Sequence, residues 1–119
     1  SRGLGDVYKR QDYVYHDAPP GTPPGKEAIR QVVTMFRAGF PDLTIDIEDQ
    51  VAERDLVCTR STTRGTHQGT IFGIPATGNT VAMPGLTLVR IVDGRVAESW
   101  VKNDVQALMR QLGANPSAH

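Results

Sequence analysis

Residues 88–100 read LVRIVDGRVAESW, and this stretch carries the strongest fold signal in the chain. Its Asp93-Gly94 pair lies between two apolar-rich runs, and Asp-Gly in that setting favours a two-residue β-hairpin turn. The sequence therefore predicts an antiparallel hairpin whose strands run from Thr80 to Val92 and from Arg95 to about Lys102.

Two further strands are predicted upstream of this hairpin. Apolar and polar residues alternate from Leu43 to about Val51, which is typical of a half-exposed strand. A partner strand from Leu56 to about Gln68 follows after a short turn. Gly65 in its later part predicts a β-bulge, which we expect to re-aim the side chains that follow it.

Two helices flank these strands. Apolar residues at helical spacing predict an amphipathic helix that starts near Lys26 and stops before Pro41. A short second helix is predicted from Val105 to Leu112, closed by Gly113. The order helix, four antiparallel strands, helix is typical of an α+β fold in which a strongly curved antiparallel sheet wraps around helices.

The chain of 119 residues has the length of a single domain. Residues 1–11 show neither a helical nor a strand period, and we interpret them as a non-native or disordered segment. The domain is then expected to cover residues 12–114, with residues 115–119 as a tail. Four prolines in residues 19–24 predict a loop.

Composition restricts the possible partners and locations. Thirteen basic and thirteen acidic residues cancel, which argues against nucleic acid and against an anionic membrane surface. No apolar run approaches the ~20 residues that a membrane-spanning helix needs. Cys58 is the single cysteine, so no disulfide can form within the chain, and we take a cytoplasmic location as the default.

Two titratable residues near strand ends are the candidates for acid–base chemistry. Asp104 follows Trp100 and opens the last helix, so it could be a general base at a pocket mouth or the N-cap of that helix. His67 follows the expected bulge and could shuttle a proton near neutral pH, or it could be a buried structural histidine. The residues themselves leave both alternatives open.

Six further residues are candidates for substrate binding: Tyr15, His16, Arg60, Phe72, Met83 and Trp100. Asp17 follows His16 directly, but adjacent strand residues point to opposite sides, so Asp17 is not expected to orient His16. Arg60 lies in the middle of a predicted strand, and a structural ion pair with Glu98 is the favoured interpretation.

Several chemistries have no signature in the chain. The three histidines lie at positions 16, 67 and 119, which is not metal-ligand spacing, and the glycines match no phosphate or dinucleotide loop. No serine elbow or Cys–His signature is present. The sequence therefore predicts a site that works without a metal ion or a cofactor.

An ordered set of short motifs between about Asp12 and Ala114 resembles the SnoaL-like polyketide cyclase family. The resemblance implies the cone-shaped, cystatin-like α+β fold with an internal pocket, shared with nuclear transport factor two, ketosteroid isomerase and limonene epoxide hydrolase. The family's N-terminal helix is expected to be missing or replaced in this chain. The motifs are FPDL (40–43), IED (47–49), Arg60, GTHQG (65–69), GIPATG (73–78), DG (93–94), ESW (98–100), Asp104 and QLG (111–113).

The resemblance also implies a function. Family cyclases close a polyketide ring by aldol condensation without a cofactor, after a carboxylate removes a proton next to a carbonyl group. By motif, Asp104 matches that base and His67 matches a family histidine, so Asp104→Asn is expected to abolish turnover. A homodimer packed through the sheets is implied as well.

Two alternatives remain open at this level. One is an epoxide hydrolase of the limonene type, with Arg60 and Asp104 in an Asp–Arg–Asp set. The other is a small-molecule-binding module of the same fold that does not transform its ligand.

Overall fold

The computed structural model describes residues 9–17 and 25–113 of the chain. It confirms the predicted α+β fold class and each element predicted from Lys26 onward. The interpretations of residues 1–8, of the proline-rich loop at 18–24 and of the tail lie outside the described residues. The elements are β1 (Lys9–Tyr15), α2 (Lys26–Gly39), β2 (Thr44–Glu53), β3 (Leu56–Thr66), β4 (Thr80–Val92), β5 (Arg95–Asn103) and α3 (Val105–Gln111).

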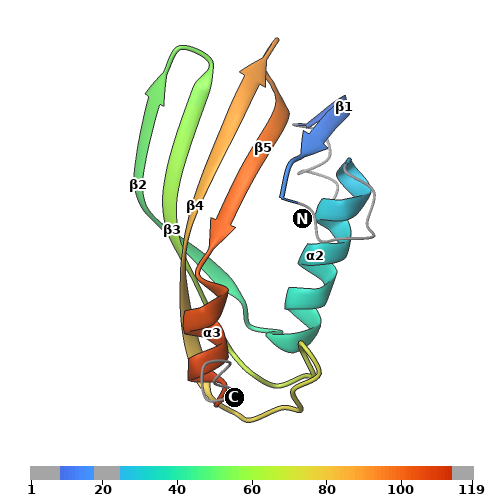
Figure 1. The fold of residues 1–119 in the computed structure, drawn as a ribbon, viewed down its shortest axis with the longest axis vertical. Helices are drawn as coiled ribbons and strands as arrows, with labels where there is room; N and C mark the ends of the chain where they lie inside the picture. The colour runs from blue at the N-terminus through green and yellow to red at the C-terminus, as the bar shows by residue number, and fades with distance from the viewer. Residues whose placement is uncertain (1–8, 18–24, 114–119) are drawn as a thin grey trace.

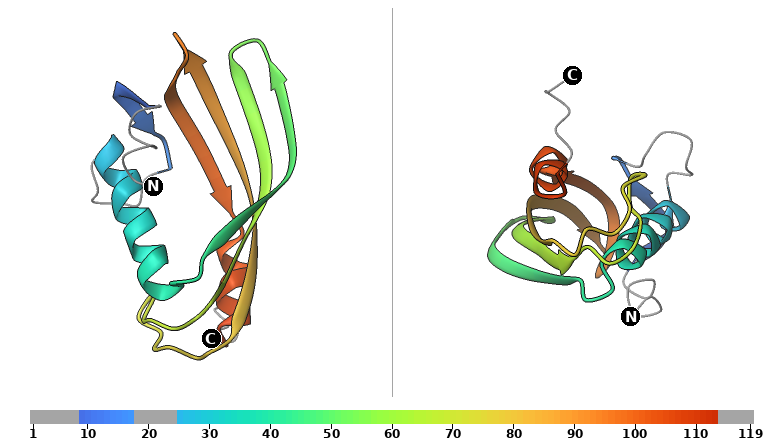
Figure 2. Two further views of the ribbon diagram at one scale, coloured as in Figure 1. Left: turned by 180° about the vertical axis from the view of Figure 1, so that it is seen from behind. Right: turned by 90° about the horizontal axis from the view of Figure 1, so that it is seen from below.

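The strands form one five-stranded sheet in the order β1-β5-β4-β3-β2. The sheet is strongly curved, α2 lies along its concave side, and α3 follows β5 at the lower end of the molecule (Figures 1 and 2). No helix in the described part of the chain is long and apolar enough to cross a membrane. The predicted hairpin at Asp93-Gly94 is confirmed: both residues have positive φ, of 52° and 75°, as a type I′ turn requires.

β1 pairs in parallel with the edge of β5. It begins at Lys9, so residues 9–11, which precede the expected domain, belong to the sheet. Backbone pairing does not need an apolar period, and for that reason the sequence pattern missed these residues. Beyond β1, the carboxylate of Asp17 accepts hydrogen bonds from the Val101 N–H and from Lys102 Nζ, both at 2.7 Å.

The bulge expected at Gly65 is absent. The pairing of β3 with β4 runs without a shift through Gly65, and the irregularity in this half of the sheet lies in β2, between Ile47 and Asp49. Gly65 serves packing instead, because a Cβ atom there would lie 2.9 Å from the Cβ of Phe40. The side chains after Gly65 therefore keep the simple strand alternation.

Two apolar clusters hold the helices on the sheet. One joins α3 to the segment after α2 and to β4, and the other holds β1 against α2 and β5. Between them Val33, Ile45 and Ile47 remain 45%, 59% and 61% exposed, so apolar side chains do not fill the concave side. The buried members are Phe40, Ile71, Val81, Met83, Leu108 and Leu112 in the first cluster and Tyr13, Tyr15 and Ala28 in the second.

Gly65→Ala is expected to lower the free energy of unfolding by about 1–3 kcal/mol, because Phe40 is buried and its Cβ cannot move away cheaply. Urea denaturation measures the loss. Gly25→Ser is the matched control, since a Cβ there meets only the Tyr13 carbonyl oxygen at 3.5 Å and serine is a favoured residue at this helix N-cap. Equal losses in the two variants would contradict the packing explanation.

The attachment of β1 is expected to depend on pH through Asp17. The Lys102 ammonium, and then the Val101 N–H, hold the pKa of the Asp17 carboxyl below its usual value. A depressed folded-state pKa stabilises the fold above the unfolded pKa of about 4, and this stabilisation is lost as the pH falls through the folded-state value.

Asp17→Asn should therefore cost about 1–2 kcal/mol at pH 7, the usual effect of losing hydrogen bonds to a charged group. Thermal unfolding of both proteins across a pH series measures the difference. The gap should begin to shrink below about pH 4 and should close only when the pH falls below the lowered folded-state pKa, where the wild-type carboxyl is protonated in both states. A gap that is the same at acidic and neutral pH would show that the charge of Asp17 is irrelevant.

Candidate functional site

A cavity of about 490 Å³ lies between α2 and the concave face of the sheet. Its helix wall is apolar and includes Ile29, Val32 and Phe36, whereas β3 contributes the hydroxyl groups of Ser61 and Thr63. Apolar cavities of this size with a few polar groups are the usual sites for small organic ligands. We therefore take it as the candidate functional site.

Tyr13 and Ser99 form the most buried polar pair in this cavity. Tyr13 is 3% exposed and Ser99 is 4% exposed, and their hydroxyl groups are hydrogen-bonded to each other. Burial raises the pKa of the Tyr13 phenol, and the bond to Ser99 offsets this only in part. Tyr13 is therefore a neutral phenol at physiological pH and can donate a hydrogen bond to a carbonyl oxygen.

The described residues that line the cavity include no carboxylate, and their charged members are Lys9 and Arg37. The acidic residues of β2 bond to β3 side chains that alternate with the cavity-lining positions: Asp46 accepts from Arg64 at 2.9 Å, and Glu48 accepts from Thr62 at 3.0 Å. The curved sheet thus has a charged convex face and a concave face of apolar, hydroxyl and amide groups.

The structure brings only part of the predicted site together. Of the eight predicted site residues, Tyr15 and Met83 line the cavity. The remaining six are not among its lining residues: His16, Arg60, His67, Phe72, Trp100 and Asp104.

Asp104 is the N-cap of α3. Its carboxylate is exposed, and its Oδ1 accepts a hydrogen bond from the Ala107 N–H at 2.9 Å. The helix cap, one of the two roles expected for Asp104, is the role that the structure shows, and Asp104 is not among the residues that line the cavity.

His67 is fully buried, and its side chain closes a loop. Its Nδ1 accepts a hydrogen bond from the Thr77 N–H at 3.2 Å, and its ring packs against Phe40 with 5.7 Å between centroids. Within the described residues, its Nε2 has no hydrogen-bond partner. The buried structural histidine, one of the two roles expected for His67, is the role that the structure shows, because the ring is buried from solvent and His67 is not among the residues that line the cavity.

Arg60 lies on the opposite face of β3 from the cavity. Its Nε donates to Asp49 Oδ2 at 2.9 Å, so the predicted pair with Glu98 is wrong. Glu98 instead bonds to His16 and to Arg90, each at 2.7 Å. The reason is register: Glu98 lies opposite Arg90, four residues along β4 from the partner of Arg60, Leu86.

His16 and Trp100 form a stacked pair on the convex face, with ring centroids 4.6 Å apart. Both neighbours of Trp100, Ser99 and Val101, line the cavity, so Trp100 points to the other side of the strand. The expectation that Asp17 does not orient His16 is confirmed, since His16 bonds to Glu98 instead.

Phe72 lies at an exposed turn and reaches the site only indirectly. Its ring meets Phe36 edge-on with 6.0 Å between centroids, and Phe36 lines the cavity.

Sequence reasoning also missed Tyr13 and Ser99. Strand alternation with Tyr15 was a signal for Tyr13, but the parallel pairing that brings it to Ser99 has no local signature.

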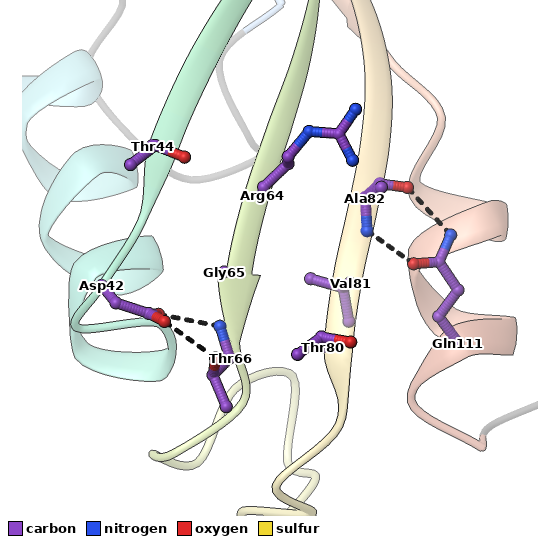
Figure 3. Close-up of a pocket in the computed structure, with 9 residues that line it drawn as sticks. All are labelled: Asp42, Thr44, Arg64, Gly65, Thr66, Thr80, Val81, Ala82 and Gln111. Atoms are coloured by element: carbon purple, nitrogen blue, oxygen red, sulfur yellow. Dashed lines mark hydrogen bonds between the residues drawn. The ribbon is translucent and has the colours of Figure 1, made fainter.

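A second hollow of about 470 Å³, shown in Figure 3, lies between α3 and the lower parts of β2, β3 and β4. There Asp42 accepts hydrogen bonds from the backbone and side chain of Thr66, both at 2.8 Å, and the amide of Gln111 bonds to the backbone N–H and C=O of Ala82. These bonds satisfy backbone groups and fasten α3 to the sheet. The hollow's polar groups therefore serve the fold.

Asp104→Ala is expected to lower the free energy of unfolding by about 1 kcal/mol through loss of the cap. Asp104→Asn should be almost neutral, because Asn is an equally good cap, and it should leave ligand binding intact. Thermal unfolding and calorimetric titration measure the two properties. Lost binding in a folded Asp104→Asn variant would contradict this assignment.

The comparisons with a family model and with solved structures agree on one protein family. The family model described as SnoaL-like polyketide cyclase matches residues 4–112. None of the curated proteins compared with the chain is similar to it.

Three solved structures illustrate the likeness. IdmH from Streptomyces antibioticus, a proposed polyketide cyclase, is 36% identical over 95% of this chain and 91% of its own, with a TM-score of 0.79. TsrD from Streptomyces laurentii is 30% identical over 96% and 84%, with a TM-score of 0.85. A proposed cyclase from Bacillus cereus, 24% identical over 97% and 71%, shares the fold with a TM-score of 0.83. The chain belongs to the SnoaL-like polyketide cyclase family.

Proposed function

We propose that this protein is a cofactor-free cyclase or isomerase that binds a hydrophobic carbonyl compound between α2 and the concave face of the sheet. The buried Tyr13–Ser99 pair carries the proposal. It is a neutral hydrogen-bond donor system in a largely apolar cavity, which is the environment in which a developing enolate oxygen is stabilised best.

The proposed reaction is an intramolecular aldol-type ring closure. A proton leaves the carbon next to a carbonyl group, the resulting enolate carbon attacks a second carbonyl carbon of the same molecule, and the new alkoxide takes up a proton. Tyr13 donates to the enolate oxygen and Ser99 supports the phenol. In ketosteroid isomerase a tyrosine likewise donates to the enolate oxygen, next to a carboxylic acid that its apolar site keeps protonated.

The proton acceptor in this proposal differs from the one expected from the sequence. The described lining offers no carboxylate, so the proposal assigns proton removal to water or hydroxide that enters the open cavity. A carbon between two carbonyl groups is acidic enough for a weak base. The protein then contributes mainly oxyanion stabilisation and a folded substrate conformation.

One observation favours a second candidate function, that of a small-molecule-binding module. Because no described lining residue is a carboxylate or a histidine, the cavity could hold a ligand without transforming it. The epoxide hydrolase alternative receives no such support, since Arg60 lies outside the cavity and is paired with Asp49 on the exposed face.

Exchange of the α-protons of β-tetralone in D₂O, followed by proton NMR, tests the proposal. The wild-type protein should accelerate the exchange, and Tyr13→Phe should reduce the acceleration by about tenfold to a hundredfold, since a buried oxyanion donor is lost. Ser99→Ala should give a smaller loss. Circular dichroism checks that both variants fold.

Arg60→Gln is the control, because it removes only an exposed ion pair and should leave the exchange rate unchanged. If the wild-type protein binds β-tetralone and a 1,3-diketone, whose acidic carbon lies between two carbonyl groups, but accelerates exchange in neither, the binding-module alternative replaces the enzyme. An unchanged rate in folded Tyr13→Phe would remove Tyr13 from the mechanism.

The homodimer implied by the resemblance and the cytoplasmic location are parts of the same proposal. The convex face is the expected contact surface between the two copies. Leu86 on this face is 48% exposed and lies among charged side chains that are paired with one another. Sedimentation analysis of the purified chain measures the mass directly.

A further inference from the structure

Polar side chains from three neighbouring strands gather around Gly85 on the concave face of the sheet. Thr59 and Ser61 come from β3, Thr87 comes from β4 and Asn103 comes from β5, and all four line the cavity. We call these four side chains the Gly85 patch. It is separate from the Tyr13–Ser99 pair and has no part in the chemistry described above.

The register of the sheet explains why these groups meet. Ser61 pairs with Gly85, and Gly85 pairs with Asn103, so the three residues form one line across β3, β4 and β5. Thr59 pairs with Thr87 two positions further along the same strands. Because adjacent strands lie about 4.8 Å apart and same-face neighbours about 6.6 Å apart, one substrate group can reach several of these side chains.

Gly85 leaves space for the amide of Asn103. A Cβ atom at position 85 would lie 2.2 Å from Asn103 Oδ1, so this amide lies over the part of β4 that has no side chain. An amide offers both donors and an acceptor at one place. A side chain at position 85 would displace it without removing any polar group.

The patch has unused hydrogen-bonding capacity. Thr59 Oγ1 accepts from Gln50 Nε2 at 3.0 Å and keeps its own proton to donate. Within residues 9–17 and 25–113, the side chains of Ser61, Thr87 and Asn103 have no hydrogen-bond partner. Ser61 and Thr87 are half-buried and Asn103 is exposed, so water solvates these groups in the free protein. A ligand oxygen that binds there replaces this water, whereas an apolar ligand would merely expel it.

Strand β5 sets the distance between the Tyr13–Ser99 pair and the Gly85 patch. Ser99 and Asn103 lie four residues apart on this strand, or about 13 Å, and both face the cavity. Val101 lies between them on the same face, and Val32 of α2 faces the same cavity. The cavity thus has two polar points separated by an apolar section.

We propose that the Gly85 patch is a second oxygen-binding subsite. Together with the Tyr13–Ser99 pair it selects an elongated substrate that carries oxygen atoms at two separated points of an apolar body. This inference rests on the proposed function, because it places both oxygens of one substrate in the same cavity. It excludes small ketones with a single oxygen as the preferred substrates.

Calorimetric titration of the whole chain with p-hydroxybiphenyl and p,p′-dihydroxybiphenyl tests the subsite. These rigid molecules differ only in the second terminal oxygen. The wild-type protein should bind the diol about tenfold more tightly than the monool, the gain expected from one well-formed buried hydrogen bond. The double variant Ser61→Ala/Asn103→Ala should reduce this preference to about twofold or less.

Gly85→Ala provides an independent test, because the new methyl group displaces the Asn103 amide while every polar group is kept. It should reduce the preference as well. Thr62→Val is the matched control on the opposite face of β3, where Thr62 bonds to Glu48, and it should keep the full preference. A wild-type protein without the preference, or one that binds neither probe, overturns the inference, as does a preference that survives in the folded variants.

The two proposals fail in different ways. Acceleration of β-tetralone exchange with no preference for the diol removes the subsite and leaves the enzyme. A diol preference that depends on the Gly85 patch, with no exchange on any ketone, keeps the subsite as part of a binding protein and removes the catalytic proposal.

Discussion

The parallel attachment of β1 to the edge of β5 is the constraint on which the candidate site depends. It places the Tyr13 phenol against Ser99 and completes the apolar cluster that holds α2 over the sheet. Asp17 secures the end of this strand through two bonds to β5. Without that pairing the cavity would lose a wall and its most buried donor, because the Tyr13 phenol, which bonds to Ser99, is carried by β1.

The second organising constraint is the alternation of side chains across a curved sheet. The ion pairs of β2 with β3 and the His16–Trp100 stack lie on the convex face, whereas hydroxyls and apolar groups lie on the concave face. This division keeps the described carboxylates in water, where they cost little to maintain, and leaves the cavity with hydroxyl and amide donors beside Lys9 and Arg37. A partly apolar cavity that is lined by donors and no described carboxylate is suited to stabilising negative charge that develops during a reaction. It also explains why the described lining offers no obvious base.

The sequence predicted the order of the elements from Lys26 onward, the Asp93-Gly94 hairpin and the family, because turn residues and apolar periods are local signals. It did not predict β1 or its parallel pairing with β5. The sequence predicted the site less well. Residues of the family motifs were interpreted as functional, whereas several of them stabilise the fold. Asp104 caps a helix, His67 closes a loop and Gly65 makes room for Phe40. A sequence motif does not distinguish residues that stabilise the fold from residues that contact a substrate.

The amino-acid sequence by itself determined the α+β class, the boundaries of the strands after Lys26 and the two possible faces of each strand, since these follow from periods of two and of 3.6 residues. Only the tertiary structure decided which face of each strand looks into the cavity, that Gly65 carries no bulge, and that Tyr13 meets Ser99 across 86 positions of the chain. Register and long-range pairing arise from the packing of whole elements against one another, so no short stretch of residues encodes them.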